Sequence, residues 1–255
     1  DAKTGSFQQY YQLTPYDFHD WDLAATPALI KTTGGKNLIV AAGKDGILHG
    51  VDPSQKKEIY KTPVTTIENA DAQFSEKETH FCPGFTGGVQ WNGPAFHPSV
   101  NMIFVNAVDW CASVNLMSQS PPPGELGKPY TGEADKDEPF GKKDPKAKWK
   151  GWLTAVNADD GSVKWKYQSP TPMLAGVTTT AGGLVITGDL NGDLLAFNAT
   201  DGKQLWKQNT GAPIGGGVIT YLARGKQYVA VAAGLTSESW LTGGSNAKVA
   251  IYALP

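Results

Sequence analysis

The sequence has 255 residues, and its 22 basic and 24 acidic side chains leave a formal net charge of −2. This balance argues against a protein that binds nucleic acid through a basic surface, and no apolar run of about 18 residues could cross a membrane as a helix. The 30 glycines, 17 prolines and 8 tryptophans are typical of many short strands joined by tight turns.

The chain opens on a turn signal that returns three more times. Its complete form is A-x-x-G-x-x-x-W, and Ala2–Gly5 begin a degraded copy with Gln9 in the tryptophan position. These first residues contain neither a start methionine nor the apolar stretch of a secretion signal. We therefore expect a processed form or part of a longer chain.

The densest polar cluster follows directly, over residues 14–22. It holds an imidazole, His19, and three carboxylates, of which Asp20 and Asp22 would share one face of a strand. Two carboxylates on one face repel each other unless something neutralises them, and a hard cation is one solution. The alternative is that these side chains cap turns and accept bonds from backbone amides.

Further along the chain, Gly43–Gly46 form a hairpin signal around Lys44, and a second degraded repeat starts at Pro53 with Tyr60 in the tryptophan position. The two cysteines, Cys82 and Cys111, lack the C-x-x-C spacing of zinc or thioredoxin sites. A disulfide and a pair of buried thiols are both compatible with this spacing.

Residues 115–150 interrupt the strand pattern with polar, proline-rich sequence of mixed charge. This composition predicts a long surface insertion between strands.

Two complete repeats follow the insertion, one beginning at Ala158 and the other at Ala199. Each reads as strand, turn, strand, and a period of about 40–50 residues indicates a propeller. We predict one all-β domain over residues 1–255: a β-propeller of four-stranded antiparallel blades, partial, with roughly five blade equivalents. Trp165 and Trp206 are predicted to be structural, lying across the neighbouring blade.

Residues 14–20, T-P-Y-D-F-H-D, resemble the active-site stretch T-P-H-D-x-W-D of the pyrroloquinoline-quinone (PQQ) dependent alcohol dehydrogenases, the quinoproteins. Tyr16 stands where that family has histidine, and His19 where it has tryptophan. The A-x-x-G-x-x-x-W repeats resemble the family's tryptophan-docking motif, and the resemblance extends over nearly the whole chain. It implies the C-terminal half of an eight-bladed propeller.

The resemblance implies an oxidoreductase that oxidises a primary alcohol, or a related alcohol or sugar, by hydride transfer to metal-bound PQQ. Asp20 aligns with the general base and, with Asp22, would bind the metal. Lanthanide-dependent members carry an aspartate at the position of Asp22, and calcium-dependent members a small residue. Lys44 aligns with the basic residue that contacts the PQQ carbonyl oxygens, and Gln90, Trp91 and Asn92 with the region that faces the cofactor.

The same resemblance implies a periplasmic protein that passes electrons to a cytochrome c-type acceptor. The family's catalytic domain is about twice as long, and its other metal ligands come from earlier blades. We expect the missing half on another segment or chain, or two copies that pair to close a ring. The alternative function is a non-catalytic propeller of PQQ-like repeats, acting as a periplasmic binding or assembly scaffold. Asp20, Asp22 and Lys44 favour the enzyme, because a scaffold has no need of them.

Overall fold

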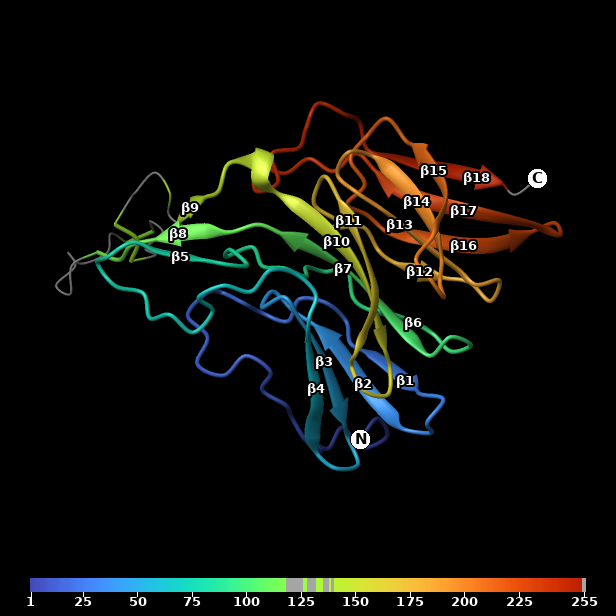
Figure 1. Ribbon diagram of the computed structural model, residues 1–255, viewed down its shortest axis with the longest axis horizontal. Helices are drawn as coiled ribbons and strands as arrows, with labels where there is room; N and C mark the ends of the chain where they lie inside the picture. Colours follow the sequence, from blue (N-terminus) through green and yellow to red (C-terminus); the bar gives the residue numbers. More distant parts are fainter. Residues whose placement is uncertain (118–125, 128–131, 135–137, 139, 254–255) are drawn as a thin grey trace.

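The computed structural model describes residues 1–117, 126–127, 132–134, 138 and 140–253, and its regular structure is nearly all β (Figure 1). Within these residues the one helical element is a 3₁₀ turn, η1 (Lys146–Lys148). No helix of this part of the chain is long and apolar enough to cross a membrane.

Four antiparallel sheets follow one another, and we call them the first to fourth blades. The first blade contains β1 (Ala28–Lys31), β2 (Asn37–Ala42), β3 (Ile47–Asp52) and β4 (Lys57–Pro63). The second contains β6 (Ala95–His97), β7 (Met102–Asp109), β10 (Lys150–Asn157) and β11 (Val163–Ser169). The third contains β12 (Thr178–Thr179), β13 (Leu184–Gly188), β14 (Asp193–Asn198) and β15 (Gln204–Asn209). The fourth contains β16 (Val218–Ala223), β17 (Lys226–Ala233) and β18 (Lys248–Ala253).

The predicted all-β propeller of antiparallel blades is therefore confirmed. A fifth, smaller sheet pairs β5 (Thr79–Phe81), β8 (Ala112–Val114) and β9 (Lys142–Lys143). It is built from segments that precede β6 or separate β7 from β10, so it is an accessory to the second blade. Of the insertion expected over 115–150, residues 118–125, 128–131, 135–137 and 139 lie outside the described part.

Consecutive blades bury their apolar faces against each other. Side chains of β7 alternate between the two neighbours: Ile103 and Val105 join the core shared with the first blade, whereas Phe104 joins the core shared with the third. The third and fourth blades share another core, which includes Leu194 and Val231. A strand covered on both faces must be apolar at nearly every position, and six of the eight residues of β7 are fully buried.

The repeated turns join these blades by one common contact. Trp165 on β11 donates its indole Nε1 to the carbonyl of Ala199 at 3.0 Å. Its ring covers Gly202, where a Cβ would lie 2.6 Å from the indole and where φ is +72°. Tyr60 makes the corresponding contact on Gly161, and its hydroxyl donates to the carbonyl of Ala158 at 3.4 Å. The degraded repeat therefore keeps the docking geometry with a smaller aromatic ring.

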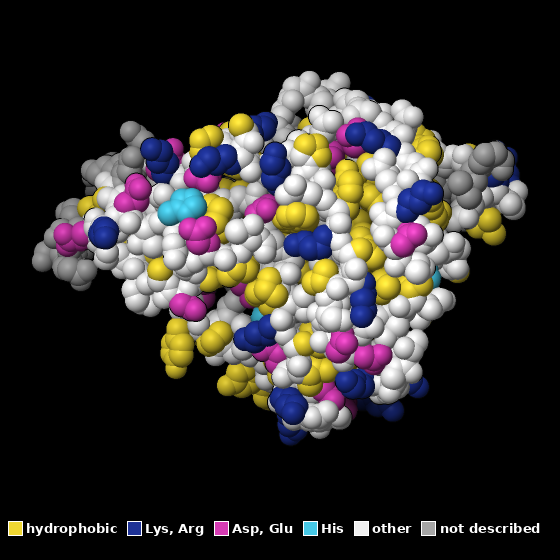
Figure 2. All heavy atoms as spheres, viewed as in Figure 1, with side chains coloured by type: hydrophobic (Ala, Val, Ile, Leu, Met, Phe, Trp, Pro, Cys, Tyr) yellow, Lys and Arg dark blue, Asp and Glu magenta, His cyan; other side chains and the backbone are white. Residues whose placement is uncertain are grey.

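The outer face of the fourth blade is apolar and exposed. Ile219 and Ile251 lie opposite Ala230 in the ladder, and they are 56% and 57% accessible to solvent. Elsewhere, Figure 2 shows acidic and basic side chains interspersed over the visible face, with no large patch of one sign. That distribution agrees with the small net charge and offers no basic track for nucleic acid on this face.

Candidate active site

The acidic segment ahead of β1 forms a tight loop held by its own first aspartate. The carboxylate of Asp17 accepts the backbone N–H of His19 at 3.1 Å and that of Trp21 at 2.8 Å. Between these two residues the backbone of Asp20 turns into the left-handed region, with φ at +64°. An aspartate adopts that conformation more readily than most residues, so the loop needs no glycine at this position.

Two aromatic rings anchor the loop to the protein. His19 and Trp21 stack with ring centroids 3.9 Å apart, and both are buried. The indole of Trp21 donates to the carbonyl of Gly84 at 3.2 Å. Burial lowers the pKa of His19, although the nearby carboxylate of Asp17 partly offsets this, so the imidazole is held neutral.

The alternation of the loop therefore points Asp20 and Asp22 outward while His19 and Trp21 point inward. The side chains of Asp20 and Asp22 are 67% and 58% exposed, and both converge on Lys44. The ammonium Nζ of Lys44 lies 3.1 Å from a carboxylate oxygen of each, and it also donates to the backbone carbonyl of Asp20 at 2.9 Å. The ammonium of Lys44 thus lies between the two carboxylates and neutralises part of their charge, and the hard cation expected from the sequence stays a prediction.

Lys44 is presented from the turn between β2 and β3, and its side chain is only 13% exposed. The neighbouring loop packs directly on it: a Cβ on Gly87 would lie 2.3 Å from the Cβ of Lys44, and φ of Gly87 is +77°. The N–H of Gly88 donates to the carbonyl of Lys44 at 2.8 Å. The side chain is therefore held from the backbone side, and its ammonium end faces the acidic loop.

A buried network that sequence reasoning missed supports this turn. His49 on β3 is 1% exposed; its Nε2 lies 2.8 Å from the carboxylate of Asp45, and its Nδ1 lies 2.5 Å from that of Glu58. Burial alone would lower the pKa of His49, but the bonds and charges of the two carboxylates outweigh it and raise the pKa. The only signal in the sequence was the spacing of Asp45 and His49, four residues apart.

The predicted cofactor-facing residues at 90–92 differ in their surroundings. Trp91 is 47% exposed. Asn92 is buried; it accepts the N–H of Gln90 at 3.1 Å and donates to the carbonyl of Asn106 at 3.1 Å. The amide of Asn92 is thus engaged in holding the backbone of this segment, and the side chains of Gln90 and Trp91 are not part of that contact.

The two cysteines form a disulfide, Cys82–Cys111, with their Cα atoms 4.4 Å apart. The bond ties the glycine-rich loop 84–88 to the end of β7. Trp110, directly before Cys111, donates its indole N–H to the carbonyl of Gly87 on this loop at 3.0 Å. Of the two alternatives left open by the sequence, the disulfide is the one observed.

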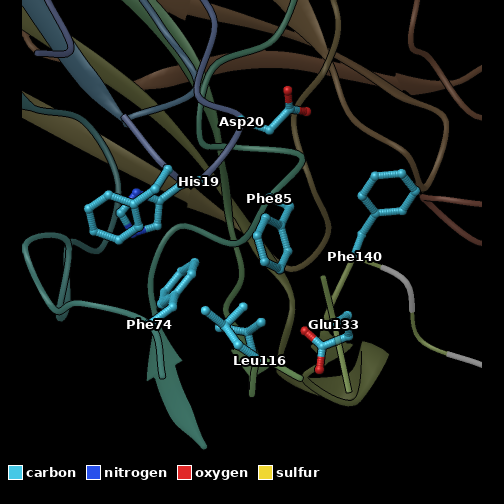
Figure 3. Close-up of a pocket in the computed structure, with 9 residues that line it drawn as sticks. His19, Asp20, Phe74, Phe85, Leu116, Glu133 and Phe140 are labelled. Carbon is cyan, nitrogen blue, oxygen red and sulfur yellow. The ribbon is translucent and has the colours of Figure 1, made fainter. Parts of the chain in front are cut away.

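A cavity of about 250 Å³ opens beside Asp20 (Figure 3). Its apolar walls come from five separate segments and consist of Phe18, Phe74, Phe85, Val114, Leu116 and Phe140. His19, Asp20 and Glu133 complete the lining. Sequence reasoning missed this cavity, because no local pattern links phenylalanines that are so far apart in the chain.

Comparison with known proteins supports the relationship that the motifs indicated. A family model of PQQ-type repeats, described as outer membrane protein assembly factor BamB, matches residues 149–243. The quinohemoprotein alcohol dehydrogenase of Comamonas testosteroni is 30% identical over 260 residues, which cover 92% of this chain and 36% of that protein. The putative dehydrogenase XoxF of Paracoccus denitrificans is 28% identical, and the match covers 92% of this chain and 43% of that protein.

Solved structures give the same relationship. A europium-containing methanol dehydrogenase matches 88% of this chain and 42% of its own, with a TM-score of 0.73 and 25% identity. The C. testosteroni enzyme matches in fold over 99% of this chain and 41% of its own, with a TM-score of 0.79 and 24% identity. The resemblance to the quinoprotein alcohol dehydrogenases is confirmed, and the chain spans less than half the length of the relatives it matches.

Proposed function

We propose that this chain carries the base, the cation ligands and part of the cofactor contacts of a PQQ-dependent alcohol dehydrogenase. The observation that carries the proposal is the convergence of Asp20 and Asp22 on Lys44, each at 3.1 Å from the same Nζ. Two carboxylates held close together repel each other. A scaffold propeller would gain nothing from gathering two exposed carboxylates around one positive charge.

The residues fit the groups that the family implies. Asp20 and Asp22 would hold the metal ion, because carboxylate oxygens suit hard cations, and two of them suit a trivalent lanthanide as well as Ca²⁺. Lys44 supplies a fixed positive charge for an anionic quinone. Trp91, exposed on the neighbouring loop, offers an aromatic face, and Gln90 offers an amide. PQQ, when bound, supplies the hydride acceptor.

In the reaction, Asp20 takes the proton of the alcohol hydroxyl as the general base. Its exposed carboxylate lies at the edge of the cavity, so an alcohol bound there would bring its hydroxyl to this group. Lys44 would stabilise the negative charge that the quinone gains with the hydride. The Asp17 carboxylate and the buried stack of His19 and Trp21 keep the base in position.

We further propose that the protein acts in the periplasm and passes electrons to a cytochrome c-type acceptor. The exposed apolar face of the fourth blade would be covered by further blades or by a second copy of the chain. The scaffold alternative is favoured by one observation, the match of residues 149–243 to the assembly-factor model. That match covers the third blade and parts of its neighbours, and it leaves out the acidic loop and Lys44.

Asp20→Asn tests the proposal in dye-linked alcohol oxidation by the protein loaded with PQQ and La³⁺ or Ca²⁺. We expect a loss of about 100-fold or more in kcat, the usual contribution of a general base, with an unchanged circular dichroism spectrum. Asp201→Asn, in the exposed turn between β14 and β15, is the matched control. Equal activity in Asp20→Asn and the control would contradict the assignment of the base.

Asp22→Ala serves as the second variant in this assay. If Asp22 adds a ligand for a trivalent ion, the substitution reduces La³⁺-supported turnover more than Ca²⁺-supported turnover. The same loss with both ions would contradict its role in metal selection.

A further inference from the structure

The cavity beside Asp20 is formed before any ligand arrives. Phe74 packs edge-on against Phe18 with ring centroids 5.0 Å apart, and against His19 at 4.9 Å. On the other side Phe81 lies 5.0 Å from Phe74 and 4.9 Å from Phe85. Rings that hold one another in edge-to-face contact cannot easily collapse into the space, so the cavity is a preformed aromatic pocket.

The size of the cavity does not suit the smallest alcohols. Its volume of about 250 Å³ is far larger than a single water molecule needs. A one-carbon alcohol, with a single methyl group, would fill little of this space and would leave most of the apolar wall in contact with solvent. Each further methylene that is buried there strengthens binding by about fourfold.

The charges around the cavity disfavour an anionic ligand. The ionised groups among its described lining residues are the carboxylates of Asp20 and Glu133, and no lysine or arginine is among them. Glu133 already accepts the N–H of Asn115 at 3.2 Å. A hydroxy acid would therefore meet two carboxylates in the cavity lining, while the ammonium of Lys44 is already paired with Asp20 and Asp22.

We propose that this cavity binds the carbon skeleton of the alcohol and selects uncharged primary alcohols with a phenyl-sized apolar group over methanol. The inference rests on the proposed role of Asp20, which lies at the cavity edge and would meet the hydroxyl while the ring lies among Phe18, Phe74 and Phe85. Edge-to-face contacts with three phenylalanines favour an aryl group over a flexible chain of equal volume.

Saturation-transfer NMR with benzyl alcohol tests this on the full chain without cofactor, because the cavity is already open in this state. We expect transfer to the aromatic protons of benzyl alcohol, and no displacement by a tenfold excess of methanol. Leu116→Trp fills the cavity and should weaken binding at least tenfold. Phe18→Ala, at a side chain that is 37% exposed and therefore tolerant of truncation, should weaken it severalfold.

Phe7→Ala is the control, since Phe7 is 76% exposed and is not among the cavity lining. Equal benzyl alcohol binding in all four proteins, or its absence from the wild type, would overturn the inference. Displacement by methanol at up to a tenfold excess would overturn the selectivity. A PQQ titration on the same samples separates the two proposals: binding of PQQ without benzyl alcohol rejects this inference alone, and binding of benzyl alcohol without PQQ rejects the proposed function alone.

Discussion

The contact between Trp165 and the turn of the third blade makes a quantitative prediction about stability. Trp165 donates to the buried Ala199 and covers Gly202, whereas the equivalent Trp206 on β15 is 41% exposed and has Tyr252 as its ring neighbour at 5.5 Å. Among the described residues Trp206 has no acceptor for its indole N–H. The two tryptophans occupy the same place in the repeat, so they form a matched pair with different contacts.

The expected loss in the free energy of unfolding follows from those contacts. Trp165→Phe keeps a ring over Gly202 but leaves the carbonyl of Ala199 without its donor, at a cost of about 1–3 kcal/mol. Trp165→Ala also removes the ring, and for a partly exposed tryptophan we expect the lower end of the usual range, about 3 kcal/mol. For Trp206→Phe, no hydrogen bond is lost, and the change should stay within about 0.5 kcal/mol.

Urea unfolding of the four proteins measures these differences. With a slope of about 3 kcal/mol/M, the loss in Trp165→Ala lowers the midpoint by about 1 M. The slopes should stay equal, since the native surface changes little. Equal midpoint shifts for Trp165→Phe and Trp206→Phe would refute the reasoning, because they would mean that the docking bond does not stabilise the blade interface.

Two further predictions concern the disulfide and the buried histidine. Replacing both Cys82 and Cys111 by serine should lower the free energy of unfolding by about 3–4 kcal/mol, because the bond closes a loop over a sequence separation of 29. Adding a reductant to the wild type should reproduce this loss. An unchanged melting temperature in the double variant would contradict the prediction. The raised pKa of His49 means that its stabilising contribution is complete below the unfolded value, about 6.5, and is lost as pH rises through the folded value. The stability difference between wild type and His49→Gln, measured by thermal unfolding, should therefore shrink as pH is raised from about 6 to 9; a difference that grows with pH would contradict the network.

The repeat could be predicted from sequence because it depends on local geometry. The turns at Gly161 and Gly202 need a left-handed residue, and the aromatic ring that docks on each of them, Tyr60 or Trp165, needs a flat surface to cover. Even the degraded copy follows this rule: Lys56 stands in the glycine position and keeps φ at +54°. Local constraints of this kind leave a trace in the spacing of residues.

The acidic loop was predicted in part. The alternation of residues 19–22 correctly indicated that Asp20 and Asp22 point to one side, but through a turn with a left-handed residue, since no strand forms here. Of the two interpretations left open by the sequence, turn capping is seen at Asp17, which accepts backbone amides. Asp20 and Asp22 pair with the ammonium of Lys44, and their binding of a hard cation stays a prediction. One sequence pattern thus serves two purposes.

Features that join distant segments left no trace in the sequence. The full set of partners of His49 could not be predicted, because the second one, Glu58, comes from the next strand after a register shift in the ladder. The phenylalanine cavity depends on the accessory sheet, and this sheet is not part of the sequence repeat. Such contacts are set by how blades and insertions pack, and spacing alone does not encode that packing.

The central claim is that this chain holds the cation and cofactor half-site, and a PQQ titration followed by tryptophan fluorescence tests it most directly. Trp21 flanks both aspartates and Trp91 lies on the adjoining loop, so bound quinone should quench their emission. The account predicts saturable quenching that requires La³⁺ or Ca²⁺ and disappears with a chelator. Fluorescence that stays unchanged with PQQ under all three conditions would contradict it.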